Sequence, residues 1–115
     1  MPLPAHLTQF LASVHPYDSL PDAALADLSE RCALAPFAAG ETIFAIGQEV
    51  GSLFVIVEGE VDITDETGVQ LSLLGPRNSF GERALLRDET ASRSATAVTD
   101  ASLIVMPSVV LIALG

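Results

Sequence analysis

Residues 79–97 read SFGERALLRDETASRSATA, and this stretch decides how the rest of the chain is interpreted. An aromatic residue and a glycine precede an acid, Glu82, and small strand-forming residues begin after Arg93. Gly81 has no Cβ, so backbone at this point can come close to a ligand. Arginine presents a planar fork of donors that fits phosphate oxygens, and a carboxylate can accept hydrogen bonds from sugar hydroxyls. The stretch therefore predicts a pocket for a phosphorylated sugar.

A short apolar run, Ala84-Leu85-Leu86, lies between the acid and the charged loop that ends at Arg93. We interpret this run as a short helical turn. The first N–H groups of such a turn have no partner within it and can point at an anion. The turn would therefore add backbone donors to the predicted phosphate pocket.

Eight short strands are predicted around this stretch, because the spacing of apolar residues changes from about 3.6 to 2 at Ala33. They span residues 33–37, 42–45, 53–58, 60–64, 70–74, 79–81, 94–98 and 101–106. Glycine-containing turns separate them, and Gly59 is expected to make a tight turn between two paired strands. The pattern predicts a mainly β fold, an eight-stranded jelly roll or double-stranded β-helix barrel.

Two helices are predicted before the strands, over residues 4–14 and from about residue 21 to Cys32, with Ser19 as the cap of the second. Apolar residues recur at helical spacing in both, namely Leu7, Phe10, Leu11 and Val14 in the first and Leu25, Leu28 and Cys32 in the second. The pair is expected to pack on the barrel or on a neighbouring subunit. Cys32 is the only cysteine, which excludes an internal disulfide and predicts a small buried apolar residue.

The composition limits the class of partner. The chain has 115 residues and a net charge of −10, so we expect one domain that does not attract nucleic acid or an anionic membrane. No apolar run approaches the ~20 residues that a membrane span needs. The start lacks the features of a signal peptide, which predicts a cytoplasmic protein. Four of the five basic residues, all arginines, lie between residues 77 and 93, as an anion site in an acidic domain requires.

Three motifs carry a resemblance to a known family. Phe80-Gly81-Glu82, Ala84-Leu85-Leu86 and Arg93-Ser94-Ala95-Thr96 resemble the phosphate-binding cassette of the cyclic nucleotide-binding domain family. That family includes the bacterial catabolite activator protein and the regulatory subunits of protein kinase A. The glycine pattern from Gly40 to Gly59 is also similar, and the resemblance covers roughly residues 18–106.

The resemblance implies a ligand and a site. Glu82 would hold the ribose 2′-hydroxyl, and Arg93 with the backbone of Ala84 and Leu85 would hold the cyclic phosphate. Cyclic AMP is favoured over cyclic GMP, with no other cofactor and no metal. The implied ligand-binding residues are Phe80, Gly81, Glu82, Ala84, Leu85, Arg93, Ser94 and Ala95. Val57, Leu71 and Leu73 are candidate apolar walls of the pocket.

The resemblance also implies an organisation into three parts: N-terminal helices over 1–32, the barrel over 33–106 and the start of a C-terminal helix over 107–115. In the family this last helix relays ligand binding to an output domain, and a further helix covers the base. The chain has no room for that lid, so we expect either a fragment of a longer protein or a lid supplied from elsewhere. A homodimer is a further expected partner.

The sequence departs from the family pattern in places, and the longer loop, together with the missing lid, supports a second hypothesis. The loop from Leu86 to Arg93 is longer by one or two residues, and Asn78 is expected to take a left-handed conformation where the family often has glycine. Under this hypothesis the domain has lost its ligand and acts as an interaction or dimerisation module in a bacterial signalling protein. Both hypotheses describe a domain that is not an enzyme. The only histidines, His6 and His15, precede the barrel and cannot build a catalytic metal site within it.

Overall fold

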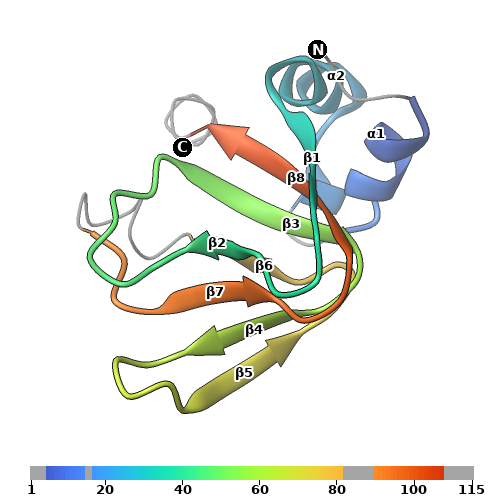
Figure 1. The fold of residues 1–115 in the computed structure, drawn as a ribbon. Helices are drawn as coiled ribbons and strands as arrows, with labels where there is room; N and C mark the ends of the chain where they lie inside the picture. Colours follow the sequence, from blue (N-terminus) through green and yellow to red (C-terminus); the bar gives the residue numbers. More distant parts are fainter. Residues whose placement is uncertain (1–4, 15–16, 82–89, 108–115) are drawn as a thin grey trace.

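The computed structural model describes residues 5–14, 17–81 and 90–107 (Figure 1). Two helices, α1 (Ala5–Leu11) and α2 (Asp22–Arg31), flank a short 3₁₀ helix, η1 (Tyr17–Ser19). The strands that follow are β1 (Ala33–Phe37), β2 (Thr42–Phe44), β3 (Ser52–Glu58), β4 (Val61–Thr64), β5 (Gln70–Leu74), β6 (Ser79–Phe80), β7 (Ser94–Ala97) and β8 (Ala101–Pro107). Each predicted strand is present, with bounds that differ by at most one residue.

The strands form two four-stranded antiparallel sheets, in the orders β1-β8-β3-β6 and β2-β7-β4-β5. A core of buried side chains from both sheets lies between them, composed of Phe44, Ile56, Val61, Phe80, Ala91, Ala95, Ala97, Ala101 and Leu103. This arrangement confirms the predicted mainly β jelly-roll fold. The predicted cassette helix at 84–86 and the C-terminal helix lie outside the described residues.

Gly59 joins the two sheets, so the prediction of a hairpin at this position is wrong. β3 pairs with β6 and β8, whereas β4 pairs with β5 and β7. Gly59 has φ of 91°, and a Cβ there would lie 2.5 Å from the carbonyl oxygen of Asp100. Only glycine fits this crossing. Residue alternation could not reveal the error, because it identifies strands and not their partners.

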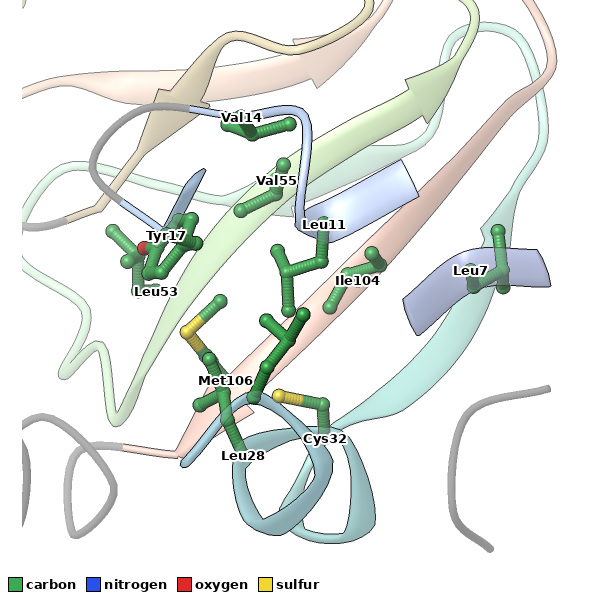
Figure 2. Packing of buried hydrophobic residues seen from close by; sticks show 11 residues of the cluster. Leu7, Leu11, Val14, Tyr17, Leu28, Cys32, Leu53, Val55, Ile104 and Met106 are labelled. Atoms are coloured by element: carbon green, nitrogen blue, oxygen red, sulfur yellow. The ribbon is translucent and has the colours of Figure 1, made fainter. Parts of the chain in front are cut away.

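The helices cover the outer face of the first sheet, which confirms the expectation that they pack on the barrel (Figure 2). Leu7, Leu11, Val14, Tyr17, Leu25, Leu28 and Cys32 pack against Leu53, Val55, Ile104 and Met106. β3 and β8 are therefore buried on both faces, because their alternate residues face the core between the sheets. This explains the unbroken apolar run at residues 53–57.

The second helix begins later than its predicted cap. Pro21 is the N-cap residue, and its carbonyl oxygen accepts a hydrogen bond from the N–H of Leu25 at 2.9 Å. Ser19 belongs to η1 instead, so its predicted capping role is wrong. Cys32 follows the helix at 2% exposure, which confirms the predicted buried position.

The turn before β6 also differs from expectation. Arg77 has φ of 76°, so it is Arg77 and not Asn78 that adopts the left-handed conformation. The Oδ1 atom of Asn78 accepts a hydrogen bond from the N–H of Gly75 at 2.9 Å. The asparagine therefore closes the turn with its side chain, and the strained backbone moves one residue earlier. The N–H of Arg77 then donates to the carbonyl oxygen of Ile56 at 2.8 Å.

Candidate functional site

The first end of the cassette is held against the start of β3. Gly81 directly follows β6 and has φ of 92°. A Cβ at this position would lie 3.1 Å from the carbonyl oxygen of Ser52 and 3.3 Å from the ring of Phe54. We predict a glycine here so that the backbone can come close to a ligand. The structure adds a second reason, because the backbone of Ser52 and the ring of Phe54 leave little room for a Cβ.

Phe80 anchors this end in the core. Its ring is 6% exposed and stacks on the ring of Phe54, with centroids 5.2 Å apart and an interplanar angle of 14°. The ring of Phe44 lies 5.9 Å from that of Phe80. The side chain of Phe80 therefore supports the backbone that leads into the cassette.

The second end of the cassette meets the same aromatic group. Phe44 pairs with Ala95 in the ladder between β2 and β7, and Ala95 is fully buried. Phe44 thus contacts strand β7 through its backbone and Phe80 through its ring. The structure brings the predicted residues Phe80 and Ala95 together at Phe44, a residue that the sequence analysis did not single out.

Arg93 and Ser94 stand where β7 begins. Arg93 is half-buried, and its Nη1 atom donates to the carbonyl oxygen of Ser92 at 3.1 Å. Arg93 directly precedes the strand, two residues before the buried Ala95. The Oγ atom of Ser94 accepts a hydrogen bond from the N–H of Ile46 at 3.2 Å. The hydroxyl hydrogen of Ser94 remains a donor for an anion.

Ala91, two residues before Arg93, is held by backbone hydrogen bonds. Its N–H donates to the carbonyl oxygen of Gln48 at 2.9 Å, and its carbonyl oxygen accepts from the N–H of Gly47 at 2.9 Å. Ala91 is 5% exposed, and Thr90 forms a β-bridge with Glu49. The chain is therefore held two residues before Arg93. Sequence reasoning missed this anchor, whose only signal is a small residue between polar ones.

An acid lies beside Arg93. The Oδ1 atom of Asp65, in the turn between β4 and β5, accepts hydrogen bonds from the N–H and hydroxyl of Thr67 and from the N–H of Val69, at 2.8, 2.6 and 3.0 Å. These bonds, those from Thr67 above all, lower the pKa of the Asp65 carboxyl, and the charge of Arg93 lowers it further. Asp65 is therefore an ionised carboxylate near the predicted phosphate position.

The apolar walls predicted for the pocket are placed elsewhere. Val57 packs against the helices on the outer face of the first sheet. Leu73 pairs with Asp62, on the face opposite to the core side that Val61 and Leu74 share. Leu71 lies at a register shift and is 46% exposed. Val57 and Leu73 do not face the interior, because strand alternation assigns them to outer faces.

A hollow of about 490 Å³ opens at the far end of β3, and it does not suit an anion. Among its lining residues are three acids, Glu41, Glu58 and Asp100. Two of these carboxylates bind backbone, since Glu41 accepts from the N–H of Ala38 at 3.1 Å and Asp100 from the N–H of Ala39 at 2.9 Å. The hollow is therefore an acidic surface separate from Arg93.

Three of the predicted ligand-binding residues, Glu82, Ala84 and Leu85, lie outside the described residues. The other five lie at the two ends of the cassette, with Phe80 and Gly81 after β6 and Arg93, Ser94 and Ala95 at β7. The sequence profile of the cyclic nucleotide-binding domain matches residues 34–114, which include both ends. The chain belongs to the cyclic nucleotide-binding domain family.

Similar proteins are longer than this chain. A cyclic nucleotide-gated potassium channel of Mesorhizobium japonicum is 32% identical over 100 residues, which are 87% of this chain and 27% of the channel. A CRP-like cAMP-activated global transcriptional regulator of Mycobacterium tuberculosis is 27% identical over 104 residues, which are 87% of this chain and 46% of the regulator. The chain thus spans less than half the length of these relatives.

A solved structure shows the same fold. The sensor domain of the transcriptional regulator DNR from Pseudomonas aeruginosa superposes with a TM-score of 0.85 at 22% identity, covering 94% of this chain and 75% of that one. In the part of this chain that the structure describes, no helix has the length and apolar character to cross a membrane.

Proposed function

We propose that this domain is a regulatory module that binds a cyclic nucleotide, with cAMP preferred to cGMP, at the junction of β6 and β7. The observation that carries the proposal is the double hydrogen bond of Ala91 to Gly47 and Gln48, which presents Arg93 and Ser94 at the start of β7. A phosphate site needs donors in a fixed position, because a site that is ordered in advance spends less of its binding energy on ordering.

Arg93 is the proposed phosphate ligand. Its guanidinium donates to a neutral backbone carbonyl oxygen, that of Ser92, which a charged phosphate oxygen would replace with a stronger charge-assisted bond. Ser94 would add its hydroxyl hydrogen, and Gly81 would lead the backbone into the cassette. By their match to the family motif, we assign the ribose 2′-hydroxyl to Glu82 and further phosphate contacts to the backbone of Ala84 and Leu85.

The ligand would regulate something beyond this chain. The relatives that carry this domain include a channel and a transcriptional regulator, which favours a sensor attached to an output domain. We propose that residues after β8 relay binding by a shift between two packed arrangements. The domain would be cytoplasmic and would itself catalyse no reaction.

A second function has one observation in its favour. The edge strand β5 and the residue before it expose Val69, Leu71 and Leu73 at 56, 46 and 50%. An exposed apolar edge strand is a common surface for pairing with another chain. The domain would then be an interaction or dimerisation module without a ligand.

Calorimetric titration with cAMP and with cGMP decides between these functions. The native chain is expected to bind, and Arg93→Ala is expected to lower the affinity roughly 30- to 1000-fold through loss of a charge-assisted contact. Arg31→Ala is the matched control, because Arg31 lies on α2 and pairs with Asp27 at 3.5 Å. Absence of heat with either nucleotide at millimolar concentration would leave the interaction module as the function of this chain.

A further inference from the structure

We propose that Asp65 sets the affinity of the phosphate site, because it follows the strand position opposite Ser94 and places a negative charge next to Arg93 that opposes an incoming anion. The proposal rests on the function proposed above and adds a residue that lowers affinity. It predicts that a single conservative change makes the domain bind its nucleotide more tightly.

The register of the second sheet places the two residues together. β4 and β7 run antiparallel, with Val61, Asp62, Ile63 and Thr64 opposite Ala97, Thr96, Ala95 and Ser94. Thr64 and Ser94 are the last pair of this ladder, so Asp65 and Arg93 occupy the next position. Asp65 directly follows β4 and Arg93 directly precedes β7. The register therefore places the acid next to the residue proposed to hold the phosphate, and the charge of Arg93 acts on the Asp65 carboxyl.

The carboxylate is held in position by its own turn. All three of its hydrogen bonds, from Thr67 and Val69, end on Oδ1. No described residue donates a hydrogen bond to Oδ2. These bonds stabilise the charged form, so the negative charge persists at neutral pH. Asp65 and Arg93 make no direct ion pair, and the carboxylate therefore acts on the site through its field.

A fixed negative charge at this point has two consequences for an anionic ligand. It repels the phosphate directly, and it offsets part of the attraction that Arg93 exerts. Both effects weaken binding, and both are screened by salt because the site is open to solvent. A domain that must respond to changes in ligand concentration needs such a limit on its affinity, since a site that is always occupied reports nothing.

Asp65→Asn tests the proposal while preserving the turn. Asparagine keeps a side-chain oxygen that can accept the same hydrogen bonds, but it carries no charge. Glu66→Gln is the matched control, because it removes one negative charge from the next residue, which is exposed and makes none of these bonds. We expect cAMP to bind Asp65→Asn about 3- to 10-fold more tightly than the native chain in 20 mM salt and less than about twofold more tightly in 500 mM salt. Glu66→Gln should stay within about twofold at both.

A second readout needs no ligand. The nuclear magnetic resonance signal of the Arg93 Nε–H group should shift between the native chain and Asp65→Asn, and should not shift in Glu66→Gln. If Asp65→Asn binds cAMP with the same affinity as the native chain, the proposal is overturned and the nucleotide function stays intact. If no form binds cAMP, the proposed function fails. An unshifted Arg93 signal then refutes the Asp65–Arg93 interaction as well, whereas a shifted signal retains the interaction and refutes only its role in nucleotide affinity.

Discussion

The backbone N–H of Ala91 donates to the carbonyl oxygen of Gln48 at 2.9 Å, and this bond ties the end of the cassette to the loop after β2. Arg93 follows only two residues later, directly before β7. The account therefore makes Ala91 a positioning residue, which acts on a ligand only through the placement of Arg93.

Replacing Ala91 with leucine should weaken nucleotide binding. The residue is 5% exposed, so the larger side chain has no room and must push the 90–93 segment away from Gln48. We expect about a tenfold or greater loss of cAMP affinity by calorimetry, with about 1–3 kcal/mol lost from the free energy of unfolding. Ala26→Leu, on the exposed side of α2, is the control and should change neither. Unchanged affinity in Ala91→Leu would show that this anchor does not position the site.

Replacing Gly59 with alanine should destabilise the fold strongly. The added Cβ meets the backbone of Asp100 and Ala101 at 2.5 and 2.8 Å, and φ at this position is 91°. The left-handed conformation alone costs roughly 1–2 kcal/mol, and the clash adds to it, so at least about 2 kcal/mol should be lost in urea unfolding. Gly51→Ala is the matched control, because its Cβ would meet open space. An effect of equal size at both positions would contradict the crossing that we describe.

Replacing Arg77 or Asn78, in the turn before β6, with glycine should change the free energy of unfolding in opposite directions. Arg77→Gly relieves a left-handed arginine and should raise the free energy of unfolding by about 0.5–1 kcal/mol. Asn78→Gly removes the side-chain acceptor of the Gly75 N–H and should lower it by about 1 kcal/mol. Thermal unfolding of both variants measures this directly. Stabilisation by Asn78→Gly instead would mean that Asn78 is the left-handed residue.

Alkaline pH should destabilise the domain through Cys32. Burial raises the pKa of the Cys32 thiol from 9.0 to about 11. The thiol is protonated in both states below pH 9, so it contributes no pH dependence there. Between pH 9 and 11 the unfolded chain loses this proton and the folded chain keeps it. Stability should therefore fall as pH rises through this window, by at most about 1.4 kcal/mol per pH unit.

Urea unfolding at pH 8, 9 and 10 tests this for the native chain and for Cys32→Ala. The variant lacks the thiol, so its stability should fall less steeply over the same range. The difference between the two slopes isolates Cys32 from the other groups of the chain, which both forms share. Parallel slopes would show that the thiol is as accessible to ionisation in the folded chain as in the unfolded one.

Local pattern was enough to predict the strands, but not how they associate. The alternation of apolar residues gave the bounds of β1 and β5 without error, because alternation is a property of each strand alone. The hairpin predicted at Gly59 is wrong because the partners of β3 and β4 are chosen by contacts between distant segments. The prediction of a left-handed Asn78 fails for a similar reason. The side chain of Asn78 closes the turn by accepting a hydrogen bond from the N–H of Gly75, and Arg77 takes the left-handed conformation.

The candidate site shows the same division. Motif matching brought out Gly81, Arg93 and Ser94, whose types are dictated by phosphate chemistry. It could not bring out Ala91 or Asp65, which act through a backbone hydrogen bond and through strand register. Both depend on which segments lie side by side, and an alanine or an aspartate in a loop has no chemical signature of that placement.

Titration of the ¹⁵N-labelled chain with cAMP, followed by nuclear magnetic resonance, tests the central claim most directly. The claim is that the ligand binds where β6 ends and β7 begins. The account predicts that the amide signals of Gly81, Arg93, Ser94 and Ala95 shift in a saturable way, while those of Ala38 and Ala39 beside the acidic hollow stay in place. Shifts confined to the acidic hollow, or no shift at millimolar cAMP, would contradict it.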